Sequence, residues 1–283
     1  MSDNVLPAPV HYVRPGNVLL RNAFGKALWD ARRSLLGWTV AIVAVAAGYG
    51  AFWPYVQSPE MAQALEAYPK AVLDALDFDL LTAAGYLRGS VYGLLVPLLL
   101  AIFAISAGTR TIAGDEESGT LDLVLAHPVS RGRLAVQRFA AVVVQTFVIY
   151  LLLLLAMLAL TGPAGFDGVT ATEFAATNLQ LALFGVCFGA LAFAIGAATG
   201  SRSLALWGSA AVAVLAYVAK ALVAQVDGLD WVRKLSPFDW FIGGDPLSNG
   251  LQATGSLLLL GSSVVLFALG ALRFANRDLS AGG

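Results

Sequence analysis

The amino-acid sequence predicts an all-α polytopic membrane protein with six transmembrane helices. Of its 283 residues, 58% are hydrophobic and only 12% are charged, and the mean hydropathy is +0.76. A soluble domain carries about 25% charged residues, so this chain has too few charges to cover a water-exposed surface. The apolar residues also fall into six runs that are long enough to cross a bilayer, which fixes the expected number of spans.

Each predicted span is a mostly apolar run of about 20 residues or more, the length that crosses the hydrocarbon layer. The six runs cover residues 35–56, 86–109, 133–160, 173–199, 203–226 and 251–272. Pro97 lies inside the second run, where a proline removes a helical hydrogen bond, so a kink is expected there. No internal repeat occurs, and a single domain over residues 1–283 is predicted.

Lysine and arginine residues predict the orientation of these spans. Twelve of the 17 lie in segments on the side that carries both termini, and four lie on the opposite side. Cytoplasmic loops carry the excess of basic residues, so both termini are expected in the cytoplasm, with the chain in the cell membrane. No apolar core followed by a cleavage site precedes residue 35, so the first span is expected to direct insertion.

The segment before the first span, residues 17–34, has the pattern of an amphipathic helix. Its apolar residues recur at i, i+4, i+7, i+8 and i+11, and they are Leu20, Phe24, Ala27, Leu28 and Ala31. Basic residues mark another face, which predicts a helix lying in the cytoplasmic membrane interface. The alternative is a helix that only anchors the first span.

Several kinds of chemistry are missing from the sequence. No G-x-x-x-x-G-K-[ST] phosphate loop occurs, so the chain is not expected to bind ATP in that manner. The two histidines, His11 and His127, are far apart, and no metal site is expected. Apart from Lys220 near one span end, the span centres carry no charged relay of the kind that ion-coupled transporters use. The net charge of -1 gives no reason to expect a nucleic-acid partner.

The connection between the second and third spans contains the most informative segment. Three consecutive carboxylates, Asp115 to Glu117, open a predicted short helix over residues 115–127, where they favour the positive end of the helix dipole. Leu121, Val124 and Leu125 then form an apolar ridge at i, i+3 and i+4, and Pro128 ends the helix before Arg131. Such a ridge binds a groove in a partner protein or packs on the chain's own helices, and both possibilities remain open at this point.

The connection before the sixth span, residues 227–250, is rich in aromatic residues. Trp231, Phe238, Trp240 and Phe241 belong at a membrane–water boundary. This segment is expected to dip into the outer leaflet rather than project freely, and these four residues are predicted to form an outer gate.

Two stretches of the chain resemble a known family. The run E-S-G-T-L-D-L-V-L-A-H-P-V-S-R at residues 117–131 is similar to the coupling-helix region of ABC-2-type permeases. The run S-P-F followed by G-G-D-P-L, within residues 236–247, resembles that family's segment before its sixth span. The six-span plan with cytoplasmic termini and an amphipathic leading helix matches as well, whereas the E-A-A…G signature of ABC importers does not fit.

The resemblance implies a transport function powered by other subunits. Two permeases, either two copies of this chain or this chain and a related one, would pair within the lipid, and each would bind a cytoplasmic ABC ATPase subunit. ATP and Mg²⁺ would be held by that ATPase, with no cofactor in this chain, and most relatives are exporters of drugs, lipids or polymers. The residues implied to couple to the ATPase are Glu116, Glu117, Gly119, Thr120, Leu121, Val124, Leu125, Pro128 and Arg131.

Two functions of other classes are the alternatives. The chain could be a membrane anchor or assembly factor that binds a cytoplasmic partner and transports nothing. A membrane-embedded enzyme is disfavoured, because Gly243-Gly244-Asp245 has the wrong spacing for an aspartyl protease and no second carboxylate lies in mid-span.

Overall fold

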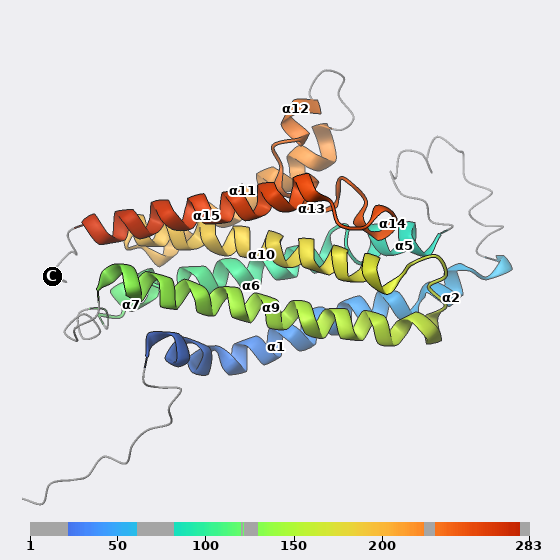
Figure 1. Cartoon of the computed structure of the whole chain (residues 1–283), viewed down its shortest axis with the longest axis horizontal. Coiled ribbons are helices and arrows are strands. Elements are labelled where there is room, and N and C mark those ends of the chain that lie inside the picture. Colours follow the sequence, from blue (N-terminus) through green and yellow to red (C-terminus); the bar gives the residue numbers. More distant parts are fainter. Residues whose placement is uncertain (1–21, 61–81, 120, 122–129, 224–229, 278–283) are drawn as a thin grey trace, which may run out of the picture.

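The computed structural model describes residues 22–60, 82–119, 121, 130–223 and 230–277, and within these ranges it contains helices and no strand (Figure 1). Five helical segments are long and apolar enough to cross a membrane. They are α1 (Ala23–Ala51) with its extension α2 (Trp53–Val56), α9 (Arg131–Ala164), α10 (Ala171–Thr199), α11 (Arg202–Val223) and α15 (Ala253–Asn276). The pair α5 (Ala83–Ser90) and α6 (Leu95–Thr109) makes a sixth when it is taken as one bent span. The predicted class, an all-α polytopic membrane protein, is confirmed.

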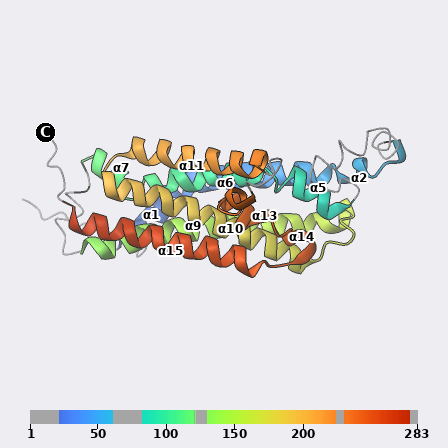
Figure 2. The same ribbon diagram turned by 90° about the horizontal axis from the view of Figure 1, so that it is seen from above.

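Helix α10 lies in the middle of the bundle (Figure 2) and packs against α6, α9, α11 and α15. In its most apolar stretch 72% of the residues are buried, compared with 17–39% in the other four candidate spans. Small residues let its neighbours approach closely: a methyl group at Gly108 of α6 would come within 2.4 Å of the carbonyl oxygen of Gly189 in α10. Lipid provides no hydrophobic force between helices, so close packing of this kind holds the bundle together.

The predicted kink in the second span is present, one turn before the proline. Helices α5 and α6 are bent by 42° at the break over residues 91–94. Within it, the amide nitrogens of Tyr92 and Val96 bond to carbonyl oxygens five residues back, at 3.0 and 3.4 Å. Pro97 is the third residue of α6 and has no N–H to offer to Gly93. Since proline is tolerated in the first turn of a helix and disfavoured further inside, the chain breaks ahead of it.

Helix α1 differs from the prediction at its start. Instead of a separate interfacial helix over residues 17–34, one continuous helix of 29 residues begins at Ala23, capped by the side chain of Asn22. Residues 26–36 contain neither glycine nor proline, so nothing ends the helix at the expected junction. At about 44 Å, α1 is longer than the hydrocarbon layer of about 30 Å, and its first turns extend past that layer. Residues 17–21 lie outside the described residues.

The remaining short helices lie at two places. Helix α7 (Ala113–Glu117) lies at the end of the bundle where α1 begins and α15 ends, here named the α7 end (Figure 1). Helices α12 (Asp230–Arg233), α13 (Pro237–Ile242) and α14 (Pro246–Asn249) connect α11 to α15 away from the α7 end. Within this connection α13 packs against α10, α11 and α15, as the prediction requires, whereas α12 extends away from the bundle (Figure 1).

Candidate functional site

Helix α7 follows α6 almost directly and ends after five residues. Gly119 terminates it with a left-handed backbone (φ 67°), and its amide nitrogen bonds to the carbonyl oxygen of Glu116 at 3.1 Å. The prediction of one continuous helix over 115–127 is therefore wrong at Gly119, because a left-handed glycine ends a helix. Thr120 and residues 122–129, which include Val124, Leu125 and Pro128, lie outside the described residues.

Two consecutive carboxylates of α7 form ion pairs with arginines of two spanning segments. Asp115 pairs with Arg138 of α9, and Glu116 pairs with Arg277, the residue directly after α15. The side chains of Arg138 and Arg277 are only 9% and 21% exposed. Burying a charge costs free energy unless a partner compensates it, so these pairs fix where α7 lies against α9 and α15.

The third carboxylate contacts another spanning helix. Oε1 of Glu117 accepts a hydrogen bond from the amide nitrogen of Arg202, the first residue of α11, at 2.8 Å. A negative charge is favourable there, because the first amides of a helix have no intrahelical partners. Each of the three residues from Asp115 to Glu117 thus contacts a different spanning segment, where the sequence predicts only an effect on their own helix.

Arg131 and Gly200 complete this network at the α7 end. Nη1 of Arg131, the first residue of α9, donates to the carbonyl oxygen of Arg277 at 2.7 Å, and its guanidinium lies 6.0 Å from the ring centroid of Phe274. Gly200 has a left-handed backbone (φ 72°), and a methyl group there would lie 2.5 Å from Nη1 of Arg277 and 2.6 Å from Oε1 of Glu116. Only glycine fits this position beside the ion pair.

Burial decides the electrostatics of the Asp115 carboxyl group. It raises the pKa of Asp115 above the ordinary value, although the charges of Arg138 and Lys26 act to lower it. The loss of hydration therefore outweighs the attraction to the arginine. Buried ion pairs commonly contribute little net free energy, because the cost of removing both charges from water offsets their attraction. Replacing both partners is therefore often neutral, whereas removing only one is costly.

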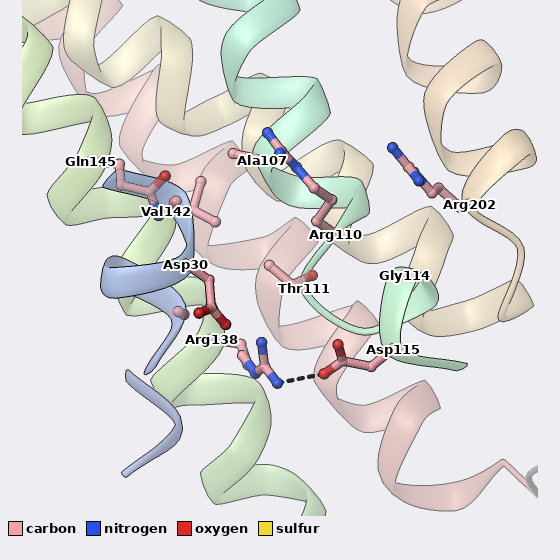
Figure 3. A pocket seen from close by; sticks show the side chains of 12 residues that line it. Asp30, Ala107, Arg110, Thr111, Gly114, Asp115, Arg138, Val142, Gln145 and Arg202 are labelled. Carbon is pink, nitrogen blue, oxygen red and sulfur yellow. Dashed lines mark hydrogen bonds and ion pairs between the residues drawn. The ribbon is translucent and has the colours of Figure 1, made fainter. Parts of the chain in front are cut away.

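A pocket of about 310 Å³ lies beside this network, where α1, α6, α7, α9 and α11 meet (Figure 3). The Asp115–Arg138 pair lies on one side of it, together with Asp30 of α1. Arg110, directly after α6, and Arg202 lie on another side (Figure 3). The lining of the pocket combines charged and polar side chains with small apolar ones.

Leu121 is the member of the predicted apolar ridge that the structure describes. It is only 2% exposed and belongs to the chain's own hydrophobic core. The prediction that this side chain offers an exposed surface to a partner is wrong, and for Leu121 the alternative of internal packing holds. Leu121 follows the turn at Gly119 and packs into the chain's own core there.

The four aromatic residues predicted as an outer gate do not share one surface. Phe238 and Phe241 are 2% and 0% exposed, and their ring centroids lie 4.8 and 5.6 Å from that of Phe184 in α10. Trp231 is 61% exposed, and Trp240 is half-buried. Phe238 and Phe241 are packing residues, because α13 turns them into the bundle.

Sequence reasoning missed the partners of the α7 carboxylates. Arg138, Arg202 and Arg277 contributed only to the prediction of topology, since no local spacing links them to residues 115–117. One signal was present for Arg138: it lies inside the third predicted span, and a charge within a span needs a buried partner. Nothing in the sequence indicated the role of Gly200.

The fold and this site define the class of the protein. In the ranges that the structure describes, no group of three His, Cys, Asp or Glu side chains could hold a metal ion. The helices are those of a multi-pass membrane protein, and their ends are joined by charged residues at the α7 end.

Comparison with known families agrees with this class. A family model described as ABC-2 family transporter protein matches residues 21–279. The chain belongs to this family and is the transmembrane permease component of an ABC transporter. No match is found among curated proteins.

Proposed function

We propose that this chain is the membrane subunit of an ABC exporter, which couples ATP hydrolysis by a separate cytoplasmic ATPase subunit to substrate movement across the membrane. The observation that carries the proposal is the contact of Asp115, Glu116 and Glu117 with three different spanning segments. A motor outside the membrane needs such a connection to move several helices together.

The geometry supports transmission of a movement of α7 to four spans. Helix α7 follows α6 in the chain, and its carboxylates contact α9, α11 and the residue after α15. Packed helices move between discrete arrangements rather than deforming continuously. An ATPase that binds the segment around residues 113–131 and displaces α7 would therefore shift these span ends as a set.

The proposal includes the partners and the location of the protein. The ATPase subunits bind ATP and Mg²⁺, and this permease pairs with a second copy or with a related permease. It lies in the cell membrane with the α7 end and both termini in the cytoplasm, as the excess of basic residues there favours.

A labelling experiment tests this orientation. In a Cys187→Ala background, Asp167→Cys places a thiol in the exposed turn between α9 and α10, and Ser118→Cys places one in an exposed position after α7. In intact cells a membrane-impermeant maleimide is expected to label Asp167→Cys and to leave Ser118→Cys unlabelled until the membrane is permeabilised. Labelling of Ser118→Cys from outside would reverse the proposed orientation.

A double-mutant cycle tests the coupling. Removing Glu116 or Arg277 breaks the ion pair between α7 and the end of α15. Glu116→Ala and Arg277→Ala are therefore each expected to reduce permease-stimulated ATP hydrolysis roughly tenfold, a factor that corresponds to a typical coupling free energy. The double variant is expected to lose no more than either single variant, because both changes remove the same contact. The measurement is the ATPase rate of the complex in nanodiscs relative to the ATPase alone.

Asp167→Asn is the matched control, because it removes an exposed carboxylate that lies outside this network, and its ATPase rate is expected to equal that of the wild type. Each variant is also tested for co-purification of the ATPase subunit. If the wild-type permease retains the ATPase and does not change its rate, the chain is a non-transporting anchor and the proposal fails.

A further inference from the structure

The side chains of two arginines on one side of the pocket at the α7 end, Arg110 and Arg202, have no role in the network described above. Arg110 lies directly after α6, and Nε and Nη2 of its guanidinium donate to the carbonyl and hydroxyl oxygens of Ser106, at 3.0 and 3.2 Å. These bonds turn the side chain back along α6. The side chain of Arg202 points the same way from the start of α11 (Figure 3). The lining of the pocket thus presents two cationic groups from two spanning helices.

The charges around these two arginines are not balanced. In the described part of the chain neither guanidinium forms an ion pair with a carboxylate. Asp115 is paired with Arg138, and Asp30 lies on the side of the pocket nearer to Arg138 (Figure 3). Burial, and then the charge of Arg202, lowers the pKa of Arg110. Two like charges on the lining of one pocket, whose side chains form no ion pair with a described carboxylate, favour binding of an anion.

The position of the pocket indicates where that anion comes from. Arg202 opens α11, whose 22 residues extend about 33 Å, close to the thickness of the hydrocarbon layer. Arg202 therefore lies at the level of the lipid headgroups. Leu204 and Trp207, on the next turns of α11, are 58% and 69% exposed, which suits contact of this helix with acyl chains.

We propose that Arg110 and Arg202 bind the phosphate group of a membrane lipid in this pocket. Guanidinium groups bind phosphate oxygens through paired charge-assisted hydrogen bonds, and basic pockets between spanning helices bind anionic headgroups. The amide of Arg202 is already bonded to Glu117, so the two side chains carry the binding. Binding at this site does not depend on ATP or on the ATPase. If the lipid proposal is wrong, the proposed transport function is not affected.

Binding of phosphatidic acid to the purified permease tests the proposal. Lipid titrations followed by native mass spectrometry and by thermal unfolding give an apparent affinity for wild type and for Arg110→Gln/Arg202→Gln. The double variant is expected to bind phosphatidic acid roughly tenfold more weakly or worse, since charged hydrogen bonds are lost. Arg110→Lys/Arg202→Lys keeps the charges without the paired geometry. Its affinity for phosphatidic acid is expected to lie between that of the wild type and that of the double glutamine variant.

The matched control is Arg133→Gln, which removes an exposed arginine of α9 that does not line the pocket. It is expected to bind phosphatidic acid as wild type does. Unchanged binding by the double glutamine variant would overturn the proposal. Titration with inorganic phosphate distinguishes the source of the anion: arginine-dependent binding of free phosphate as tight as that of phosphatidic acid would assign the site to a soluble anion and overturn the lipid assignment.

Discussion

Replacing Asp115 with alanine is expected to lower the free energy of unfolding of the permease by about 3 kcal/mol, as is usual when one partner of a buried ion pair is removed. The change leaves the guanidinium of Arg138, whose side chain is 9% exposed, without its counter-ion. Nε of Arg138 already has no hydrogen-bond partner among the described residues, and the nearby carboxylate of Asp30 forms no ion pair with it. Unfolding in mixed detergent micelles with increasing sodium dodecyl sulfate measures the loss.

The companion variant Asp115→Ala/Arg138→Leu separates a stranded charge from a general loss of packing. It removes both charges and is expected to recover most of the stability, since burial already raises the pKa of Asp115 and the pair contributes little net free energy. Asp167→Ala removes an exposed carboxylate and is expected to change stability by less than about 0.5 kcal/mol. A double variant as unstable as Asp115→Ala would contradict this account of the pair.

Replacing Phe238 with alanine is expected to cost about 3 kcal/mol or more of unfolding free energy, together with the loss of transport. Phe238 is 2% exposed and its ring lies 4.8 Å from Phe184 and 5.5 Å from Tyr217, measured between centroids. The truncation leaves a cavity where α10, α11 and α13 meet and removes these ring contacts. Thermal unfolding of the purified permease measures the effect.

Trp231→Ala is the control, because a side chain that is 61% exposed loses little packing when it is truncated. Its unfolding temperature is expected to stay close to that of the wild type. If Phe238→Ala instead keeps full thermal stability and loses only transport, the residue acts as the outer gate that the sequence predicts, and the packing role assigned here is wrong.

The α7 segment shows how far sequence reasoning reached. The run at residues 117–131 led to the family, and the family model confirms that assignment over residues 21–279. The same run misled on local structure, because one helix was predicted over residues 115–127, whereas a left-handed backbone at Gly119 ends α7. Contacts such as Glu116 with Arg277, 161 residues apart, follow from how the spans pack, which no local pattern encodes.

Composition and short sequence patterns are enough to identify this chain as a helical membrane protein of the ABC-2 family. Apolar runs of spanning length, a low content of charge and a short family motif are local properties, and the bilayer converts such runs into helices because each backbone group must be satisfied within its own segment. Only the folded bundle shows that α10 lies at the centre, that Phe238 and Phe241 are core residues, and that three adjacent carboxylates join three span ends. These features depend on which helix faces approach one another, since packing in lipid is selected by close contact and buried polar pairs rather than by hydrophobicity.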